Sequence, residues 1–224
     1  MHLPPLQPPG GVLEGQSFTA QFYNAKHHGR YGTWKDGICR CFTYGICHPH
    51  LCLACWCPLV ALAQVMVRMR LNCIGSPDGV AAVVTTFRHL LGISVSYFII
   101  DYSLEFIKLL LKSSDGDVYY RQYADDYSPP SVPDPIEVVV CEYIQSFLHF
   151  LMWAYMSIII IRTRQAVRAK YIISQKCCCE DAACAVFCGC CTIMQMSRHT
   201  ADYEKYDAPC CTETGIPSNI DATV

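Results

Sequence analysis

The chain has 224 residues, a hydrophobic content of 52% and a formal net charge of −2 at pH 7. This length suggests one domain or two small ones, and the near-neutral charge gives no support to nucleic-acid binding. The 17 cysteines are far above ordinary usage, and because their number is odd they cannot all form disulfides within the chain.

Residues 1–33 are expected to form a disordered tail. Pro4, Pro9, Gly10 and Gly11 are among the residues that break any periodic pattern there. The start of this tail lacks the basic and apolar regions of a secretory signal peptide. We therefore expect both termini to lie in the cytosol, where thiols stay reduced and cysteine clusters more often bind metal or carry lipid.

Residues 34–75 form the first of two predicted cysteine-rich halves. An apolar run from Leu51 to Val67 is at the lower length limit for a membrane span, and Pro58 interrupts it. We therefore interpret this run as a buried or interfacial helix rather than a crossing. The cysteines that cluster here are Cys39, Cys41, Cys47, Cys52, Cys55 and Cys57.

Residues 79–161 are predicted to be an inserted membrane hairpin, and its first helix would cover Val80 to Leu111. This segment is mostly apolar but contains Asp101, Glu105 and Lys108. One charge in the middle of a bilayer costs on the order of 3 kcal/mol, which a long Leu/Ile/Val/Phe run can outweigh. An amphipathic or protein-packed helix remains the alternative for this segment.

A polar, proline-rich connection is expected over residues 112–135, and it leads to the strongest membrane signal in the chain. From Tyr143 to Ile161 no side chain is fully charged, and roughly 28 Å of helix would match the hydrocarbon thickness. A basic segment with Arg162 and Lys170 follows, which the positive-inside rule places in the cytosol. An even number of crossings would bring the two cysteine-rich halves into one compartment.

The second cysteine-rich half is predicted over residues 162–200, before a flexible tail at 201–224. If Asp181 caps a helix, three thiols, an amide and a guanidinium fall along one helix face. These residues are Cys184, Cys188, Cys191, Gln195 and Arg198. The sequence thus predicts a mainly α fold: a small cysteine-rich helical domain made of two sequence halves and interrupted by a transmembrane helical hairpin.

These motifs resemble the placenta-specific gene 8 family of cysteine-rich proteins, which includes the cornifelins and the plant cadmium-resistance proteins. The first half matches its tryptophan, glycine and cysteine pattern at Trp34, Gly37, Cys39 or Cys41, Cys52, Cys57 and Pro58. The second half matches at Arg168, Lys170, Tyr171, Ile173, Asp181, Cys188, Cys191, Gln195 and Arg198. The resemblance implies a non-enzymatic membrane protein linked to zinc or cadmium tolerance, calcium entry or control of cell number, often a homo-oligomer at the plasma membrane.

The cysteines make zinc, or another soft divalent metal, the cofactor to test. A tetrahedral thiolate site needs about four ligands, and Cys188 with Cys191 has the spacing of structural zinc sites. The candidate ligands are Cys39, Cys41, Cys52, Cys57, Cys184, Cys188 and Cys191. The alternative is that these thiols are small apolar residues packed on a helix face.

Two further groups of residues are candidates for function. The run Cys177, Cys178 and Cys179 follows the basic segment, where cysteines are frequent palmitoylation sites, although it could also begin a packed domain. Asp101, Glu105 and His149 lie in or beside the candidate spans and could line an ion path. The alternative is that Asp101 and Glu105 mark the end of a helix that never enters the bilayer.

No catalytic motif supports an enzyme, because the chain has no phosphate-binding glycine loop, no G-x-S-x-G elbow and no H-E-x-x-H. We therefore expect a non-enzymatic membrane protein of divalent-metal or ion homeostasis. The alternative is a membrane-tethered scaffold that controls growth through protein partners, with lipidated or packed cysteines.

Overall fold

The protein is mainly helical, as expected. The computed structural model describes residues 31–38, 40, 42, 45, 48–77, 79–122, 135–175, 177, 179–203, 209 and 212–217. Its helices are α2 (Pro49–Trp56), α3 (Pro58–Arg68), α4 (Gly79–Gln122), α5 (Ile136–Tyr171), α6 (Glu180–Phe187) and α7 (Gly189–Thr200). Within these ranges the only extended pairing is an isolated bridge between Leu71 and Pro77.

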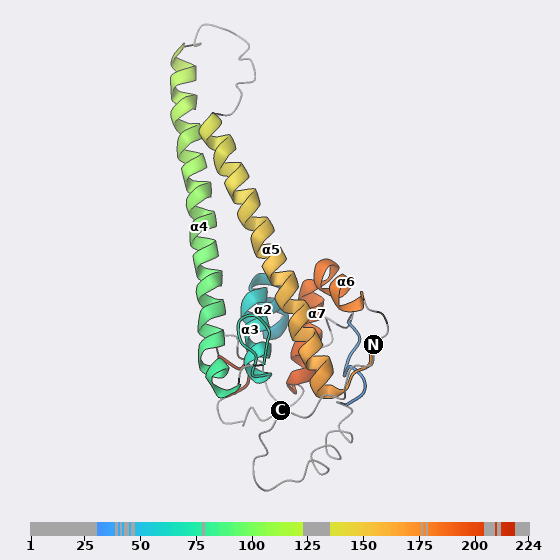
Figure 1. Ribbon diagram of the computed structural model, residues 1–224. Helices are drawn as coiled ribbons and strands as arrows, with labels where there is room; N and C mark the ends of the chain where they lie inside the picture. Colours follow the sequence, from blue (N-terminus) through green and yellow to red (C-terminus); the bar gives the residue numbers. More distant parts are fainter. Residues whose placement is uncertain are drawn as a thin grey trace.

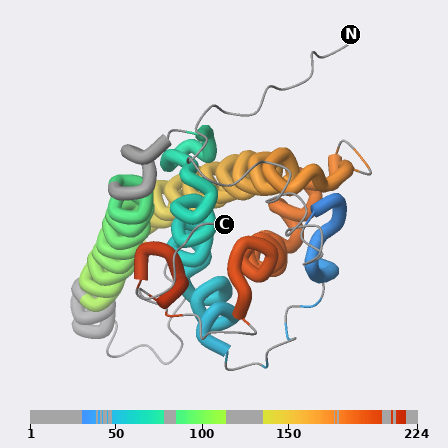
Figure 2. The backbone as a smooth tube through the Cα atoms, turned by 90° about the horizontal axis from the view of Figure 1, so that it is seen from below, coloured from blue at the N-terminus to red at the C-terminus, as the bar shows by residue number. Residues whose placement is uncertain are grey.

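A compact base domain contains both cysteine-rich halves. It consists of α2 and α3 from the first half, α6 and α7 from the second, and the C-terminal part of α5 (Figure 1). The view from below shows α3 and α7 side by side, with α5 crossing next to both (Figure 2). Every residue from Ala61 to Met69 is buried, so α3 forms the centre of this domain. The α3 part of the apolar run is therefore buried, one of the two possibilities, buried or interfacial, that its sequence left open.

Proline divides the first apolar run, as its position predicts. Pro58 begins α3, where its missing N–H costs nothing, and α2 ends at Trp56. Cys57 between them has φ −134° and ψ 63°, and the two helices form an angle of 115°. The run therefore turns sharply instead of forming one straight span.

A long hairpin of α4 and α5 projects from the base domain (Figure 1). Helix α4 continues past residue 112, where the polar connection was expected to begin, and ends at Gln122. Residues 123–134, which hold three of the four prolines of that connection, lie outside the described part of the chain, and the fourth, Pro135, is the N-cap of α5. The hairpin is thus longer than the apolar segments that predict it.

Helix α5 belongs to both regions. Its upper part pairs with α4, whereas residues such as Ile160, Arg164 and Val167 are buried in the base domain. The loop before α4 packs closely against α5, because a Cβ added to Gly75 would lie 2.7 Å from the Cβ of Arg162. With a φ of +81° as well, position 75 accepts only glycine without strain.

The end of the chain is partly attached to the base domain. Tyr203 and Ile216 are buried, and Gln64 on α3 donates to the carbonyl of Thr212 at 2.9 Å. Arg68 donates to the carbonyl of Thr214 at 2.9 Å. The described residues of the predicted tail therefore cover one side of α3.

Candidate functional site

The two cysteine-rich halves are joined by buried polar contacts. Arg198 on α7 forms an ion pair with Asp36 at 3.1 Å, and Gln195 donates to the carbonyl of Asp36 at 2.8 Å. Arg68 on α3 donates to the hydroxyl of Ser197 at 3.1 Å. Residues far apart in the sequence thus meet, and the prediction of one domain built from two halves is confirmed.

A cluster of buried charges lies where α5, α6 and α7 meet. The Nε atom of Arg164 is 2.8 Å from Asp181 Oδ1, and that of Arg168 is 3.0 Å from the same oxygen. Arg168 also pairs with Glu180 at 2.7 Å, and Arg164 donates to Gln195 at 2.6 Å. Removing one partner of such a cluster would leave a buried charge without compensation, so its role is to hold the helices together.

Aromatic rings cover this cluster of charges. The guanidinium of Arg164 lies 4.5 Å from the ring centroid of Trp34, a cation–π contact. His199 packs against Trp34 at 5.2 Å and against Tyr171 at 4.4 Å between ring centroids. Trp34, which begins the first half, therefore covers the buried charges of the second half.

Several residues of the family-like pattern now have a structural position. Arg168, Asp181, Gln195 and Arg198 all belong to the buried polar contacts. Sequence reasoning missed Arg164, which it treated only as one of the basic residues after the span. The spacing of Arg164 and Arg168 by four residues was the available signal, because it places both on one helix face.

The burial of two arginines changes how the basic segment after the span is interpreted. Arg164 is 2% exposed and Arg168 is 6% exposed, and both are paired with acidic residues. Arg68 is also buried, at 4%. Arg164 and Arg168, two of the basic residues in the segment after the span, are therefore structural and weaken the positive-inside argument.

The structure separates the predicted cysteines into different environments. The described members of the candidate metal set are Cys52 on α2, Cys57 and Cys188 at the ends of helices, Cys184 on α6 and Cys191 on α7. Within the described ranges, no group of three or more His, Cys, Asp or Glu side chains could hold a metal ion. Cys39 and Cys41 lie outside those ranges. The described thiols therefore do not fit a resident tetrahedral zinc site.

The second cysteine segment is not one continuous helix, so the prediction of a single helix face is wrong. Asp181 lies inside α6 rather than capping it, and the chain breaks at Cys188, with φ −136° and ψ 46°. Gly189 follows at once and begins α7 within van der Waals distance of Ile160 on α5, since a Cβ added to it would lie 3.4 Å from Ile160 Cδ1. Cys184 and Cys191 consequently lie on separate helices.

The electrostatics of Cys184 also disfavour metal binding. Burial raises the pKa of its thiol, an effect that Arg164 partly offsets and that Glu180 and Asp181 reinforce. The thiolate is the form that binds metals, so a metal at Cys184 would have to displace a proton held more tightly than usual. Cys177 and Cys179, two lipidation candidates, are exposed just before α6, while Cys178 lies outside the described residues.

A ladder of polar side chains joins the two helices of the hairpin. Asp101 lies 2.9 Å from His149 Nε2 and accepts from Gln145 at 2.7 Å. Lys108 donates to Gln145 at 2.6 Å and pairs with Glu105 at 2.6 Å. The structure thus brings together Asp101, Glu105 and His149, and it adds Gln145 and Lys108 to them.

This polar ladder lies well inside the candidate membrane spans. Asp101 and Glu105 are in the middle of α4, so the alternative that they mark a helix end is wrong. His149 is 50% exposed and Glu105 is 63% exposed. The ladder therefore faces outward from the hairpin as well as across it.

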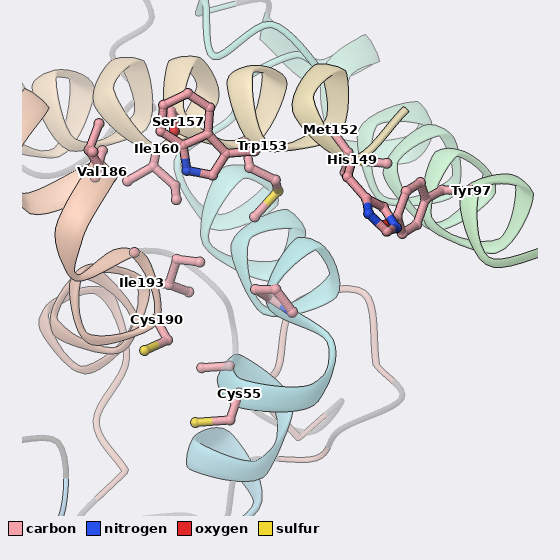
Figure 3. A pocket seen from close by; sticks show the side chains of 15 residues that line it. Cys55, Tyr97, His149, Met152, Trp153, Ser157, Ile160, Val186, Cys190 and Ile193 are labelled. Atoms are coloured by element: carbon pink, nitrogen blue, oxygen red, sulfur yellow. The ribbon is translucent and has the colours of Figure 1, made fainter. Parts of the chain in front are cut away.

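An open groove of about 390 Å³ lies between the hairpin and the base domain. Met152, Trp153 and Met156 on α5 form one wall. The side chains of Cys55 and Cys190 reach into the gap between α2 and α7, as Figure 3 shows. The groove is mainly apolar, which suits a hydrophobic neighbour better than a charged ligand.

Comparison with known families gave one match. The family model described as the PLAC8 family matches residues 34–199, which covers both cysteine-rich halves and the hairpin between them. The chain matched no curated protein sequence and no solved structure.

Proposed function

Because the chain belongs to the PLAC8 family, we propose that it is a non-enzymatic membrane protein of cation homeostasis that assembles through its hairpin. In this proposal the hairpin crosses the plasma membrane, and the base domain and both termini lie in the cytosol. The observation that carries the proposal is the polar ladder inside an otherwise lipid-compatible hairpin.

The dimensions and surface of the hairpin support a crossing. Its apolar parts are Thr85–Ser113 and a span within Ile136–Tyr171, with mean hydropathies of 1.5 and 1.7. At about 1.5 Å per residue both exceed the roughly 30 Å of a bilayer core. Exposed large side chains such as Ile99, Phe147 and Phe150 cover the outside of both helices. Water would be a poor environment for so much exposed apolar surface.

The polar ladder then requires a partner within the membrane. Ionisable side chains inside a bilayer almost always face protein or a water-filled cavity, because lipid cannot solvate them. A single hairpin leaves Glu105 and His149 more than one third exposed. Two or more copies with their ladders facing one another would enclose these groups, and the enclosed space would be lined by carboxylates.

Carboxylates lining such a path favour cations over anions. Asp101 and Glu105 would attract the ion, while Gln145 holds the two carboxylates together by donating to both from its amide nitrogen. Soft metals such as zinc or cadmium are the proposed cargo, since exposed thiols on the base domain could bind them transiently. This places the metal as a transported ion rather than as a resident cofactor.

A second function is favoured by a different observation. No described group of side chains forms a metal site, and Cys177 and Cys179 are exposed between the C-terminal end of α5 and the start of α6. In that case the protein would be a lipidated scaffold that acts through protein partners in growth control. The two functions differ in whether the protein moves ions.

Ion flux into liposomes tests the proposal. The full chain would be reconstituted with a trapped zinc- or calcium-sensitive dye, and the wild type compared with Asp101→Asn. We expect the wild type to admit the cation and the variant to admit much less, because the variant removes the carboxylate at the centre of the ladder.

Glu137→Gln is the matched control. Glu137 is an exposed carboxylate in the first turn of α5, outside the ladder, and its loss should leave the flux unchanged. Equal flux through wild type, Asp101→Asn and protein-free liposomes would refute ion movement and favour the scaffold. Chemical crosslinking of the same liposomes should show an oligomer.

A further inference from the structure

The two cysteine-rich halves contain the same structural device. In each half an eight-residue helix ends at an aromatic residue, Trp56 in α2 and Phe187 in α6. A cysteine follows in a similar non-helical conformation, Cys57 with φ −134° and ψ 63°, and Cys188 with φ −136° and ψ 46°. The next helix then begins at Pro58 or Gly189. We call these two places the helix breaks.

Each helix break exposes a large aromatic side chain. Phe187 is 83% exposed and Trp56 is 80% exposed, the two highest values among the large hydrophobic side chains that the structure describes. Neither ring covers the core of its own half. Because the two rings are this exposed at equivalent positions of the two halves, we infer that both contact the same kind of hydrophobic surroundings outside the domain.

The surroundings of both helix breaks are uncharged. The sequence has no Asp, Glu, Lys or Arg between His50 and Arg68, or between Asp181 and Arg198. The exposed neighbours of the aromatic rings are small or apolar: Cys52, Cys55, Val186, Cys188 and Cys190. The charges of the base domain are instead buried in its interior or lie elsewhere on it.

The helix breaks lie on the side of the base domain from which the hairpin rises. Figure 1 shows α2 and α6 at the upper edge of that domain, beside the middle of α5. Gly189 packs against Ile160, and the groove between the breaks is lined by Met152 and Ser157 of α5. These α5 residues belong to the uncharged segment from Tyr143 to Ile161. Both breaks therefore lie at the level of the span.

We propose that both helix breaks dip into the lipid leaflet beside the hairpin, with Trp56 and Phe187 as interfacial anchors. The proposal rests on the hairpin crossing the membrane, as proposed above. The base domain would then be partly embedded, and acyl chains would fill the end of the groove lined by Cys55 and Cys190, away from His149 of the polar ladder (Figure 3). Aromatic residues are enriched at this depth, where a ring contacts hydrocarbon near the headgroups.

Quenching by brominated lipids tests this placement in the full chain. The protein has three tryptophans, and Trp34 is packed in the base domain, so the double variant Trp56→Phe/Trp153→Phe gives the background emission. Trp153→Phe retains Trp56 as a reporter of the first break. Phe187→Trp in the double variant reports the second break with a conservative aromatic change.

In liposomes with bromines near the ester end of the acyl chains, both reporters should lose more emission than the double variant. Bromines near the methyl end should quench them less, because the breaks enter only one leaflet. Ile172→Trp in the double variant is the matched control. Ile172 is an apolar residue that is 60% exposed at the foot of α5, and it should resist both lipids.

The Trp56→Phe variant separates this inference from the proposed function, because it retains Trp153 in the hairpin. Quenching of Trp153 without quenching at positions 56 and 187 would overturn the inference while leaving the membrane hairpin intact. It would indicate that another protein surface, such as a second copy, covers the breaks. Absence of quenching at all three positions would refute the crossing itself.

Discussion

The base domain and the hairpin use charged residues in opposite ways. In the base domain Arg164 and Asp181 are each 2% exposed and are paired at 2.8 Å, with Arg168 and Glu180 beside them. In the hairpin the pair of Glu105 and Lys108 leaves the carboxylate 63% exposed. The comparison shows that the charged side chains of the base domain hold its helices together. Those of the hairpin are exposed and can contact a partner outside the chain.

The largest expected effect comes from removing the central carboxylate of the base domain. Asp181→Asn should lower the free energy of unfolding by about 3 kcal/mol, because it leaves the buried guanidinium groups of Arg164 and Arg168 with Glu180, which is partly exposed, as their remaining acidic partner. Denaturant titration in mild detergent measures this change in the Trp56→Phe/Trp153→Phe background, where the emission comes from Trp34.

Glu213→Gln is the control for that experiment. Glu213 pairs with Arg88 at 3.8 Å on the surface, with side-chain exposures of 45% and 73%. Losing this pair should cost less than about 1 kcal/mol. Equal effects of the two substitutions would show that the buried charges do not hold the halves together.

Acid should weaken the base domain through His50. Burial, together with the neighbouring His48 and Arg198, lowers the pKa of His50 from 6.5 to about 4. Because the unfolded chain takes up the proton first, the stabilisation is complete above pH 6.5 and is lost as the pH falls towards 4. The loss should reach about 3 kcal/mol across this range.

Denaturant titrations at several pH values test this effect, because each gives the free energy of unfolding at one pH. His50→Gln should flatten the dependence of stability on pH in that range. His89→Gln changes an exposed histidine at the foot of α4 and should leave the dependence as it is in the wild type. An unchanged slope in the His50 variant would assign the acid sensitivity to other groups.

The smallest effect is expected in the hairpin. Glu105→Gln should leave the unfolding midpoint in detergent unchanged, since this carboxylate is largely exposed and its pairing with Lys108 stabilises little. The same titration as for Asp181→Asn measures it. A loss comparable to that of the base-domain variant would mean that the ladder is part of the folding core, and the contrast between the two regions would disappear.

The hairpin was the part of the fold that the sequence predicted best. Its long apolar segments have a strong signal, and even the meeting of Asp101 and His149 follows once two antiparallel helices are assumed. The interruption at Pro58 was also predictable, because proline has a fixed backbone geometry and no N–H.

The polar centre of the base domain could not be predicted in the same way. Arg164 and Arg168 look like a solvated basic segment in the sequence, and only the packing of Asp181 and Glu180 against them reveals that they are buried. The break at Cys188 was missed because cysteine has no strong preference against helix, and the contact of Gly189 with Ile160 is a long-range one. The spacing of Arg164 and Arg168 places both on one helix face, but the local sequence does not say what that face packs against.

The division of the base domain by the hairpin has a consequence for biosynthesis. Asp36 and its partner Arg198 are 162 residues apart, so the ribosome completes and releases both hairpin helices before the second half emerges. Until then α3 has no partner from the second half, and a chaperone or the translocon must cover the apolar surface of α3. If the hairpin crosses a membrane as proposed, its integration would come before closure of the domain, and a nascent chain that fails to insert would be left as an open half-domain for quality control to remove.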